Sequence, residues 1–188
     1  NMSRLDMSEF SGPDALERLI GDGEHSGTLP DMLREHPYAV LLLDEFEKAR
    51  QSGHDLFLQI LDEGTFTDAR GQQVNARNTI IIATSNAGSA LIQKTVAHRQ
   101  SLDALNVEIV NHIIKQGVFR PELINRFDAT VIFEPLTETE QTKVADLMLQ
   151  ALQARIEQRG YQLVIEPALV TRLVHHGYSP TFGARALQ

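Results

Sequence analysis

The sequence predicts an α/β fold in which helices flank a parallel sheet, followed by a smaller, mostly helical C-terminal part. One observation is that short strands apolar on both faces, such as residues 38–43 and 79–83, alternate with segments of helical periodicity. Strands of that kind belong to parallel sheets covered by helices. A second observation is the change of character at Pro135-Leu136, after which apolar residues recur mostly at helical spacing. We therefore expect two domains, residues 1–135 and 136–188.

The first domain is expected to alternate strand and helix. The expected strands cover residues 1–8, 38–43, 79–83 and 129–133. The expected helices cover residues 14–20, 29–35, 55–62, 89–116 and 122–125. Residues 62–78 have glycines at two tips and polar alternation, which indicates a hairpin-like excursion. Residues 21–28, GDGEHSGT, are rich in glycine and charge, so we expect an exposed loop there.

The second domain is expected to be built on two helices. Thr137 is a plausible cap for the first of them, and Gly160 is expected to end it. A short strand over residues 162–165 should lead into a second helix from Pro167 to Gly177. The chain then closes with TFGARALQ.

Composition narrows the classes of function. The formal net charge is -8 and the pI is about 5.3, which argues against binding nucleic acid through broad neutralisation of phosphates. No apolar run approaches the roughly 20 residues that span a bilayer, and the first residues lack the order of a signal peptide. We therefore expect no membrane partner and a cytoplasmic location. The sequence has no cysteine, so disulfides and thiolate metal sites are excluded.

Two adjacent carboxylates, Asp44 and Glu45, directly follow the apolar run AVLLL. In a parallel sheet, ligands bind beyond the carboxyl ends of the strands, where loops converge. A carboxylate there can hold Mg²⁺ together with waters and substrate phosphates, and a second one can polarise a water aimed at phosphorus. The alternative is that the two residues cap the helix that follows. The pair by itself does not decide between these interpretations.

Four motifs make the chain similar to a known family. They are LLLDEFEKA, IIIATSNAGS, FRPELINRFD and GYSPTFGAR. Their order and approximate spacing resemble the second ATPase module of the Clp-type AAA+ unfoldases and disaggregases, and the likeness covers the whole chain. It implies part of an AAA+ P-loop NTPase sheet with a C-terminal lid domain. It also implies ATP as the nucleotide, Mg²⁺ as cofactor, and assembly into a homo-oligomeric ring, with six subunits as the family expectation.

The resemblance implies roles for three residues at the strand ends. Asp44 corresponds to the acid that organises Mg²⁺, largely through water, and Glu45 to the base for the attacking water. Asn86, after the strand IIIA, resembles sensor 1, whose amide orients that water against the γ-phosphate. Taken alone, an asparagine at a strand end is more often a turn former, so this alternative stays open.

Two arginines complete the implied site. Arg126 resembles the arginine finger that reaches the nucleotide of a neighbouring subunit. The alternative for Arg126 is a surface ion pair with Asp128 or Glu122. Arg185 resembles sensor 2, a cation of the lid domain that meets the phosphates. Gly183 beside it would allow a tight turn, although a helix cap explains that glycine equally well.

The chain departs from the family pattern in three places. It lacks the Gly-x-x-x-x-Gly-Lys-Ser/Thr loop that cradles phosphates, so we expect a fragment that binds ATP weakly or not at all by itself. Residues 21–28 have no aromatic residue where threading relatives carry one, and a solvated loop is favoured over a specialised grip. The hairpin over residues 64–75 resembles the secondary pore loop. No Ile/Leu-Gly-Phe/Leu tripeptide follows Asn86, which favours a disaggregase or stand-alone machine over a peptidase partner.

Two functions therefore remain open from the sequence. One is an ATP-driven motor that remodels polypeptide clients, with an adaptor or peptidase left undecided. The other is a degenerate AAA+ module that assembles without hydrolysis. A Gly-Lys-Ser/Thr loop encoded within roughly 50 residues upstream of Asn1 would favour the motor, since a βαβ unit takes about 30 or more. A nucleic-acid function is disfavoured by the acidity of the chain and by the Clp-like spacing of its motifs.

Overall fold

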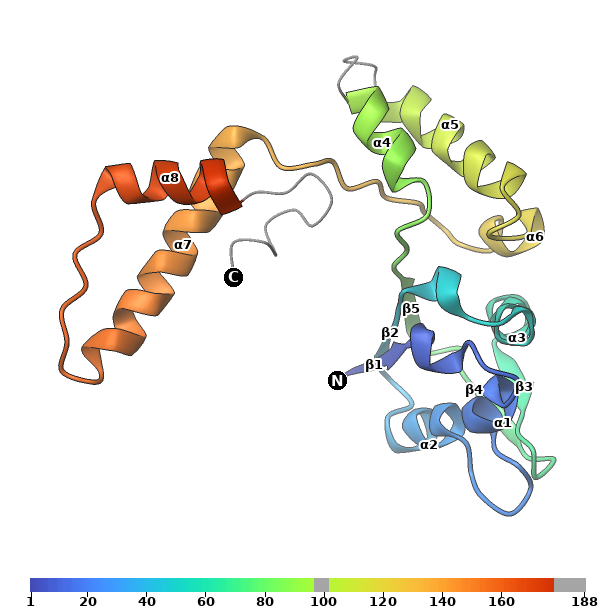
Figure 1. Cartoon of the computed structure of the whole chain (residues 1–188). Coiled ribbons are helices and arrows are strands. Elements are labelled where there is room, and N and C mark those ends of the chain that lie inside the picture. The colour runs from blue at the N-terminus through green and yellow to red at the C-terminus, as the bar shows by residue number, and fades with distance from the viewer. Residues whose placement is uncertain (97–101, 178–188) are drawn as a thin grey trace. The chain divides into compact units, whose positions relative to one another are not determined.

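A computed structural model describes residues 1–96 and 102–177 (Figure 1). The chain divides into two compact units, Asn1–Ile132 and Phe133–Gln188. The first unit contains a parallel sheet with helices in its connections, and the described part of the second contains two helices. The fold class expected from the sequence is confirmed.

Three parallel strands form the sheet of the first unit. In the spatial order β1-β2-β5, they are β1 (Met2–Asp6), β2 (Val40–Asp44) and β5 (Ile80–Ala83). Leu5 pairs with Leu43, and Leu43 pairs with Ala83, so these three residues share one rung of the sheet. The carboxyl ends of the strands therefore meet at one edge.

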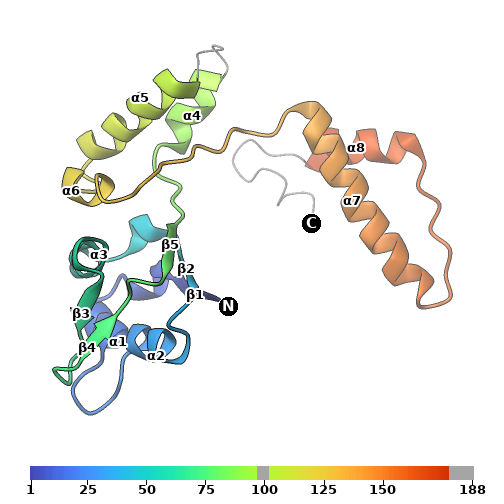
Figure 2. The ribbon, with the colours of Figure 1, turned by 180° about the vertical axis from the view of Figure 1, so that it is seen from behind.

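Helices and a hairpin fill the connections between the strands. They are η1 (Met7–Phe10), α1 (Ala15–Ile20), α2 (Thr28–Glu35), η2 (Phe46–Lys48) and α3 (Gln51–Glu63), followed by the antiparallel pair β3 (Thr65–Thr67) and β4 (Gln73–Asn75). Helix α1 packs against α2 and α3, while β3 packs on α3 and β4 on α2 (Figure 2). Helix α3 begins at Gln51, four residues before the expected start at Asp55. Its first residues, QSGH, carry no apolar periodicity, so the sequence pattern did not reveal this turn.

An aromatic cluster anchors the turn that follows β2. Phe46, the first residue of η2, lies with ring centroids 4.9 Å from His54 and 5.6 Å from both Phe57 and Phe119. The ring nitrogen Nε2 of His54 lies 2.9 Å from the carbonyl oxygen of Phe46. Burying one such aromatic side chain stabilises a fold by about 1.5–3 kcal/mol. The core thus fixes the turn immediately beyond Asp44 and Glu45.

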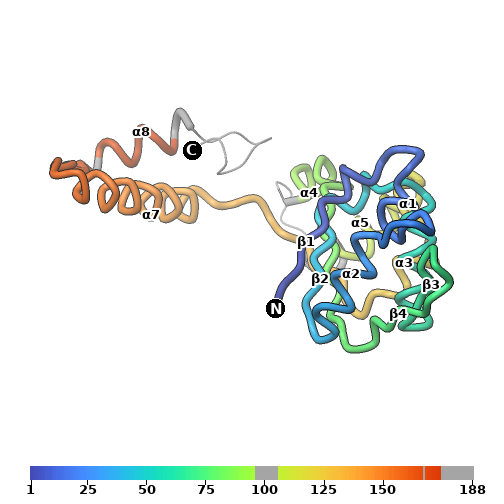
Figure 3. Tube along the Cα trace, turned by 90° about the horizontal axis from the view of Figure 1, so that it is seen from below, coloured from blue at the N-terminus to red at the C-terminus, as the bar shows by residue number. Residues whose placement is uncertain are grey.

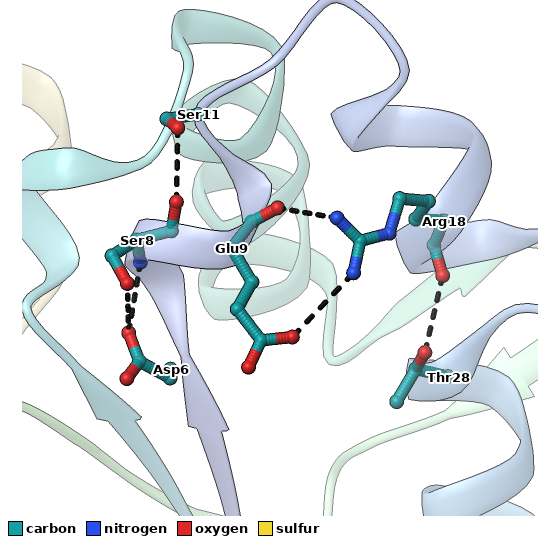
Figure 4. Close-up of polar contacts among 6 residues, drawn as sticks. All are labelled: Asp6, Ser8, Glu9, Ser11, Arg18 and Thr28. Atoms are coloured by element: carbon teal, nitrogen blue, oxygen red, sulfur yellow. Dashed lines mark hydrogen bonds and ion pairs between the residues drawn. The ribbon is translucent and has the colours of Figure 1, made fainter.

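Polar contacts hold the segment after β1 (Figure 4). Asp6 Oδ1 accepts hydrogen bonds from the backbone N–H of Ser8 at 3.0 Å and from its hydroxyl at 2.5 Å. Arg18 donates to the carbonyl oxygen of Glu9 at 2.6 Å, and the Thr28 hydroxyl donates to the carbonyl oxygen of Arg18 at 3.2 Å. These contacts connect the end of β1 to α1 and α2.

Beyond β5, the structure has two helices within residues 89–116, where the sequence predicted a long polar helical region. Helices α4 (Ser89–Val96) and α5 (Leu102–Lys115) lie side by side in Figures 1 and 2, and α6 (Pro121–Ile124) follows them. In one continuous helix, the first and last turns would lie far apart, whereas α4 and α5 pack against each other.

The strand expected over residues 129–133 is wrong, as is the one expected over residues 162–165. Val131 is 72% exposed, Phe133 86% and Val164 77%. Within the described ranges, neither segment has a strand beside it with which to pair. A strand needs such a neighbour to satisfy its backbone hydrogen bonds. An apolar sequence alone therefore did not produce one.

The described part of the second unit consists of α7 (Glu138–Glu157) and α8 (Pro167–Gly177), which pack against each other (Figure 3). Ala145, Leu149 and Val170 form their buried contact. The expected cap of α7 is confirmed, because the Thr137 hydroxyl accepts from the N–H of Glu140 at 3.3 Å. The Glu140 carboxylate accepts in return from the N–H of Thr137 at 2.8 Å, which completes a capping box.

Candidate active site

The carboxyl edge of the sheet brings Asp44, Glu45 and Asn86 together from two segments of the chain. Asp44 ends β2 and Glu45 follows it, while Asn86 lies just beyond Ala83, the last residue of β5. Because Leu43 and Ala83 are paired in register, the residues that follow them leave the sheet at the same edge. The fold thus places the three residues at the edge where ligands of parallel sheets bind.

Both carboxylate oxygens of Asp44 have a partner. The hydroxyl of Thr84 donates to Oδ1 at 2.5 Å, and Arg4 forms an ion pair with Oδ2. The Thr84 hydrogen bond, together with the Arg4 guanidinium, lowers the pKa of Asp44 below its ordinary value. Asp44 is therefore a carboxylate at neutral pH.

The donor set at this edge fits Mg²⁺. Each carboxylate oxygen has two lone pairs, so Asp44 keeps acceptor positions beyond those that Thr84 and Arg4 use. Mg²⁺ retains several waters and needs only one or two protein carboxylates beside substrate phosphates. In the part of the chain that the structure describes, no three His, Asp or Glu side chains are grouped to enclose a metal. With acceptor positions to spare, the Asp44 carboxylate is a hard oxygen donor of the kind that Mg²⁺ accepts.

Glu45 has an unusual backbone. Its φ of 53° and ψ of 47° are left-handed, and it is the only non-glycine residue with positive φ among those described. Such a conformation costs about 1–3 kcal/mol and persists only where surrounding contacts impose it. Glu45 occupies the cap position of η2 without a side-chain capping bond, and the cap of α3 is Arg50. The helix-capping alternative for the acidic pair is therefore not supported.

Asn86 is held through its backbone. Its N–H donates to Oε1 of Glu47 at 3.3 Å, and its carbonyl oxygen accepts from the N–H of Ser89 at 3.2 Å. The bond between Asn86 and Ser89 closes a turn just before α4, which agrees with the alternative that this asparagine is a turn former. The other Glu47 oxygen, Oε2, is buried and has no hydrogen-bond partner among residues 1–96 and 102–177. Sequence reasoning missed Glu47 and Thr84, although both lie within two residues of a predicted site residue.

Arg126 forms an ion pair that the sequence did not predict. Its Nη1 lies 2.8 Å from Oδ1 of Asp62 in α3, and both side chains are about half exposed, at 48% and 47%. The expected surface partners were Asp128 and Glu122, which are close in sequence. Asp62 is brought in by the packing of α6 on α3.

Arg126 lies away from the carboxyl edge of the sheet. It lines a cavity of about 630 Å³ together with Thr79 and Ile80, at the amino end of β5. Asn86 follows the opposite end of that strand. The structure therefore does not bring Arg126 to Asp44, Glu45 and Asn86 of the same chain. Arg185 lies outside the described residues.

The loop over residues 21–27 is exposed at its tip and pinned at its ends. Gly21 has a φ of +102°, and a Cβ there would lie 2.4 Å from the carbonyl oxygen of His25. At Gly27 a Cβ would lie 2.3 Å from a backbone oxygen, so both positions require glycine. Arg70 of the neighbouring hairpin donates to the carbonyl oxygen of Glu24 at 2.8 Å. The two ends of the loop are paired by a bridge between Gly21 and Ser26, and the loop contacts the hairpin through Arg70.

Asp68 organises the tip of that hairpin. Its carboxylate accepts from Arg34 at 2.6 Å and from the N–H groups of Gln72 at 2.8 Å and Arg70 at 3.0 Å. The bond from Arg34, with these backbone donors, lowers the pKa of Asp68. The hairpin tip and the loop over residues 21–27 therefore present one joined polar surface.

Two family models match the chain, and each covers most of one of the two units. Residues 1–130 match the model described as AAA domain (Cdc48 subfamily), and residues 136–188 match the C-terminal, D2-small domain of ClpB protein. The chain belongs to this AAA family, and its resemblance to the second module of the Clp-type ATPases is confirmed.

Individual relatives agree with the family. The chaperone protein ClpB of Pseudomonas putida is 39% identical over 193 residues, covering 100% of this chain and 22% of the relative. The ClpA homolog of Porphyra purpurea, an ATP-binding subunit of an ATP-dependent Clp protease, is 39% identical over 203 residues, with coverages of 100% and 25%. This chain therefore spans about a quarter or less of the length of these relatives.

Solved structures of Hsp104 have the same fold. The extended conformation of the S. cerevisiae Hsp104:casein complex superposes with a TM-score of 0.83 at 32% identity, covering 99% of this chain and 33% of that one. A closed state of Hsp104 with ATPγS and FITC casein gives a TM-score of 0.82 at 31% identity, with the same coverages.

Proposed function

We propose that this chain is part of an ATP-driven, ring-forming motor that remodels polypeptide clients. The observation that carries the proposal is the meeting of Asp44, Glu45 and Asn86 at the carboxyl edge of a parallel sheet, in a chain of the AAA family. The names of the ClpB and Clp protease relatives, and the casein and ATPγS in the Hsp104 structures, support a nucleotide-driven action on protein.

Within this proposal, Glu45 is the general base. Its carboxylate accepts a proton from a water whose oxygen forms a bond to the terminal phosphorus of ATP, while the bond from that phosphorus to the leaving ADP oxygen breaks. The side-chain amide of Asn86 orients the water, since it offers both donor and acceptor atoms. Asp44 would hold Mg²⁺, largely through water. When bound, the cation would neutralise charge on the phosphates.

The arginines are proposed to act between subunits and between domains. Arg126 lies beside the amino end of β5, whereas Asn86 follows its carboxyl end. This position suits a guanidinium that serves the nucleotide of a neighbouring subunit, as in a ring. In this role it would exchange Asp62 for phosphate oxygens. Arg185 is proposed to meet the phosphates from the lid domain, which the match of residues 136–188 to the D2-small domain of ClpB supports.

The joined surface of the loop over residues 21–27 and the hairpin tip is proposed to contact the client. Support comes from its exposure and from the contacts that hold the two segments together. A peptidase or adaptor partner stays undecided.

The cytoplasmic location remains a prediction. Over residues 1–96 and 102–177, no helix has the length and apolarity needed to cross a bilayer. One relative, ClpC4 of rice, is chloroplastic.

The full-length protein carrying Glu45→Gln tests the proposal. We expect ATP binding to persist and turnover to fall to background, because the amide keeps the shape of the side chain but cannot accept the proton. Binding is measured by titration with a fluorescent ATP analogue, and turnover by phosphate release. Glu35→Gln, at the exposed last residue of α2, is the matched control. A Glu45→Gln protein that hydrolyses ATP at the wild-type rate would refute the assignment.

A second candidate is a degenerate AAA module that assembles without hydrolysis. The discriminating measurement is phosphate release by the wild-type full-length protein. Turnover that Glu45→Gln removes supports the motor, whereas ring assembly without turnover supports the degenerate module.

A further inference from the structure

We propose that Thr84 is a positioning residue of this site, whose side-chain hydroxyl fixes the Asp44 carboxylate and the Glu45 backbone together. The inference deepens the function proposed above and rests on it for its catalytic consequence. Its structural part depends only on the contacts of this chain.

The Thr84 hydroxyl joins the two acidic residues. It donates to Oδ1 of Asp44 at 2.5 Å and accepts from the N–H of Glu45 at 3.2 Å. A carboxylate can only accept and a backbone N–H can only donate, so these partners fix the direction of the hydroxyl hydrogen. One side chain, 40 residues from Asp44 in sequence, thereby determines the relative placement of two neighbouring groups.

The backbone of Thr84 supports its hydroxyl from both sides. Its N–H donates to the carbonyl oxygen of Leu43, and its carbonyl oxygen accepts from the N–H of Phe46, each at 2.9 Å. These bonds extend the β2–β5 pairing around the turn and do not involve the side chain. Replacing the side chain therefore removes the two hydroxyl bonds and leaves the frame in place.

The left-handed backbone of Glu45 explains why a positioning bond is needed. A non-glycine residue leaves this conformation unless neighbouring contacts over-determine it. The Thr84 hydroxyl accepts directly from the N–H of Glu45. Without it, the peptide between Asp44 and Glu45 can rotate, and the base loses its fixed distance from Asp44.

The first test is amide hydrogen exchange, followed by mass spectrometry at single-residue resolution, on the full-length protein carrying Thr84→Val or Thr84→Ser. Valine keeps the shape without the hydroxyl, and serine keeps the hydroxyl. We expect exchange at Glu45 to accelerate about fivefold in Thr84→Val, as for the loss of one ordinary hydrogen bond, and to stay near the wild-type rate in Thr84→Ser. The Phe46 amide should be unchanged in both. Unaltered protection of Glu45 in Thr84→Val would overturn the inference.

A matched control exists in the same strand region. Thr79 precedes the amino end of β5, and its hydroxyl is buried without a hydrogen-bond partner in the described structure. Thr79→Val makes the same chemical change away from the carboxyl edge. It should leave exchange at Glu45 as it is in the wild type. Equal acceleration by Thr79→Val and Thr84→Val would mean general loosening of the strand and would contradict the inference.

The second test measures turnover in the full-length protein. We expect Thr84→Val to lower kcat about 10- to 100-fold, the effect usual for residues that orient the groups around a metal site, with KM within about twofold. Thr84→Ser should restore most of kcat. A Thr84→Val enzyme with wild-type kcat would refute the catalytic consequence while Glu45→Gln still stops turnover, so the failure of this inference is distinct from failure of the proposed function.

Discussion

The two units of the chain differ in how they bury apolar side chains. In the first, strands and helices contribute to one core, with Leu43, Phe46 and Phe57 fully or almost fully buried. In the described part of the second, the buried contact consists of Ala145, Leu149 and Val170, while Leu147 is 65% exposed. A sheet covered by helices collects side chains from several elements, whereas two helices share a single seam.

This difference shows where each unit gets its local order. The first unit can hold a strained residue such as Glu45 because many buried neighbours fix its surroundings. The second unit depends more on individual features, such as the capping box between Thr137 and Glu140. Substitutions should therefore act within one unit, and their sizes should follow burial.

The largest effect is expected from Phe57→Ala in the first unit. Phe57 has no exposed surface, and removing a buried aromatic ring typically costs about 3–5 kcal/mol. Urea denaturation followed by NMR signals from each unit should show the first unit unfolding earlier and the second unchanged. Phe57→Leu, which keeps most of the apolar volume, is the control. Simultaneous loss of both units would contradict their independence.

A smaller effect is expected from Leu149→Ala in the second unit. Leu149 is 9% exposed in a thin contact that can partly collapse, so the cost should be about 2 kcal/mol, at the low end for leucine. Signals from α7 and α8 should be lost earlier in urea, while signals from the sheet stay unchanged. Leu147→Ala, at an exposed position of the same helix, should have almost no effect. If Leu147→Ala destabilised the second unit as much as Leu149→Ala, the assignment of Ala145, Leu149 and Val170 as the buried contact would be wrong.

The smallest effect is expected from Thr137→Ala at the start of α7. Loss of a threonine cap costs about 1 kcal/mol. Thr137→Ser keeps the accepting oxygen and should behave as the wild type. Amide exchange in the first turn of α7 provides the measurement. If exchange at Glu140 is the same in Thr137→Ala as in the wild type, the capping box does not stabilise the helix.

Much of the fold was predictable from local pattern. The apolar runs ending at Leu43 and Ala83 predicted two strands, and Thr137 predicted the start of a helix. These features depend on residues close in sequence. The strand expected over residues 129–133 failed because a strand also needs a neighbour, and apolar residues alone cannot supply one.

The candidate site also has one part that was predictable from the sequence and one part that was not. Its residue types were chosen from the sequence, but their roles remain predictions, and the alternatives for Arg126 named only neighbours in sequence. Its actual partner, Asp62, is brought in by the packing of α6 on α3.

The sequence by itself predicted the strands that precede Asp44 and Thr84, the Thr137 cap and the acidic pair at a strand end, because each depends on residues a few positions apart. Only the tertiary structure decided that Thr84 holds Asp44 and Glu45, and that Arg126 lies away from them. Those contacts depend on strand register and helix packing, which bring together residues tens of positions apart. A hydrogen bond is formed by atoms that meet in space, and the order of residues does not specify which atoms meet until the sheet is assembled.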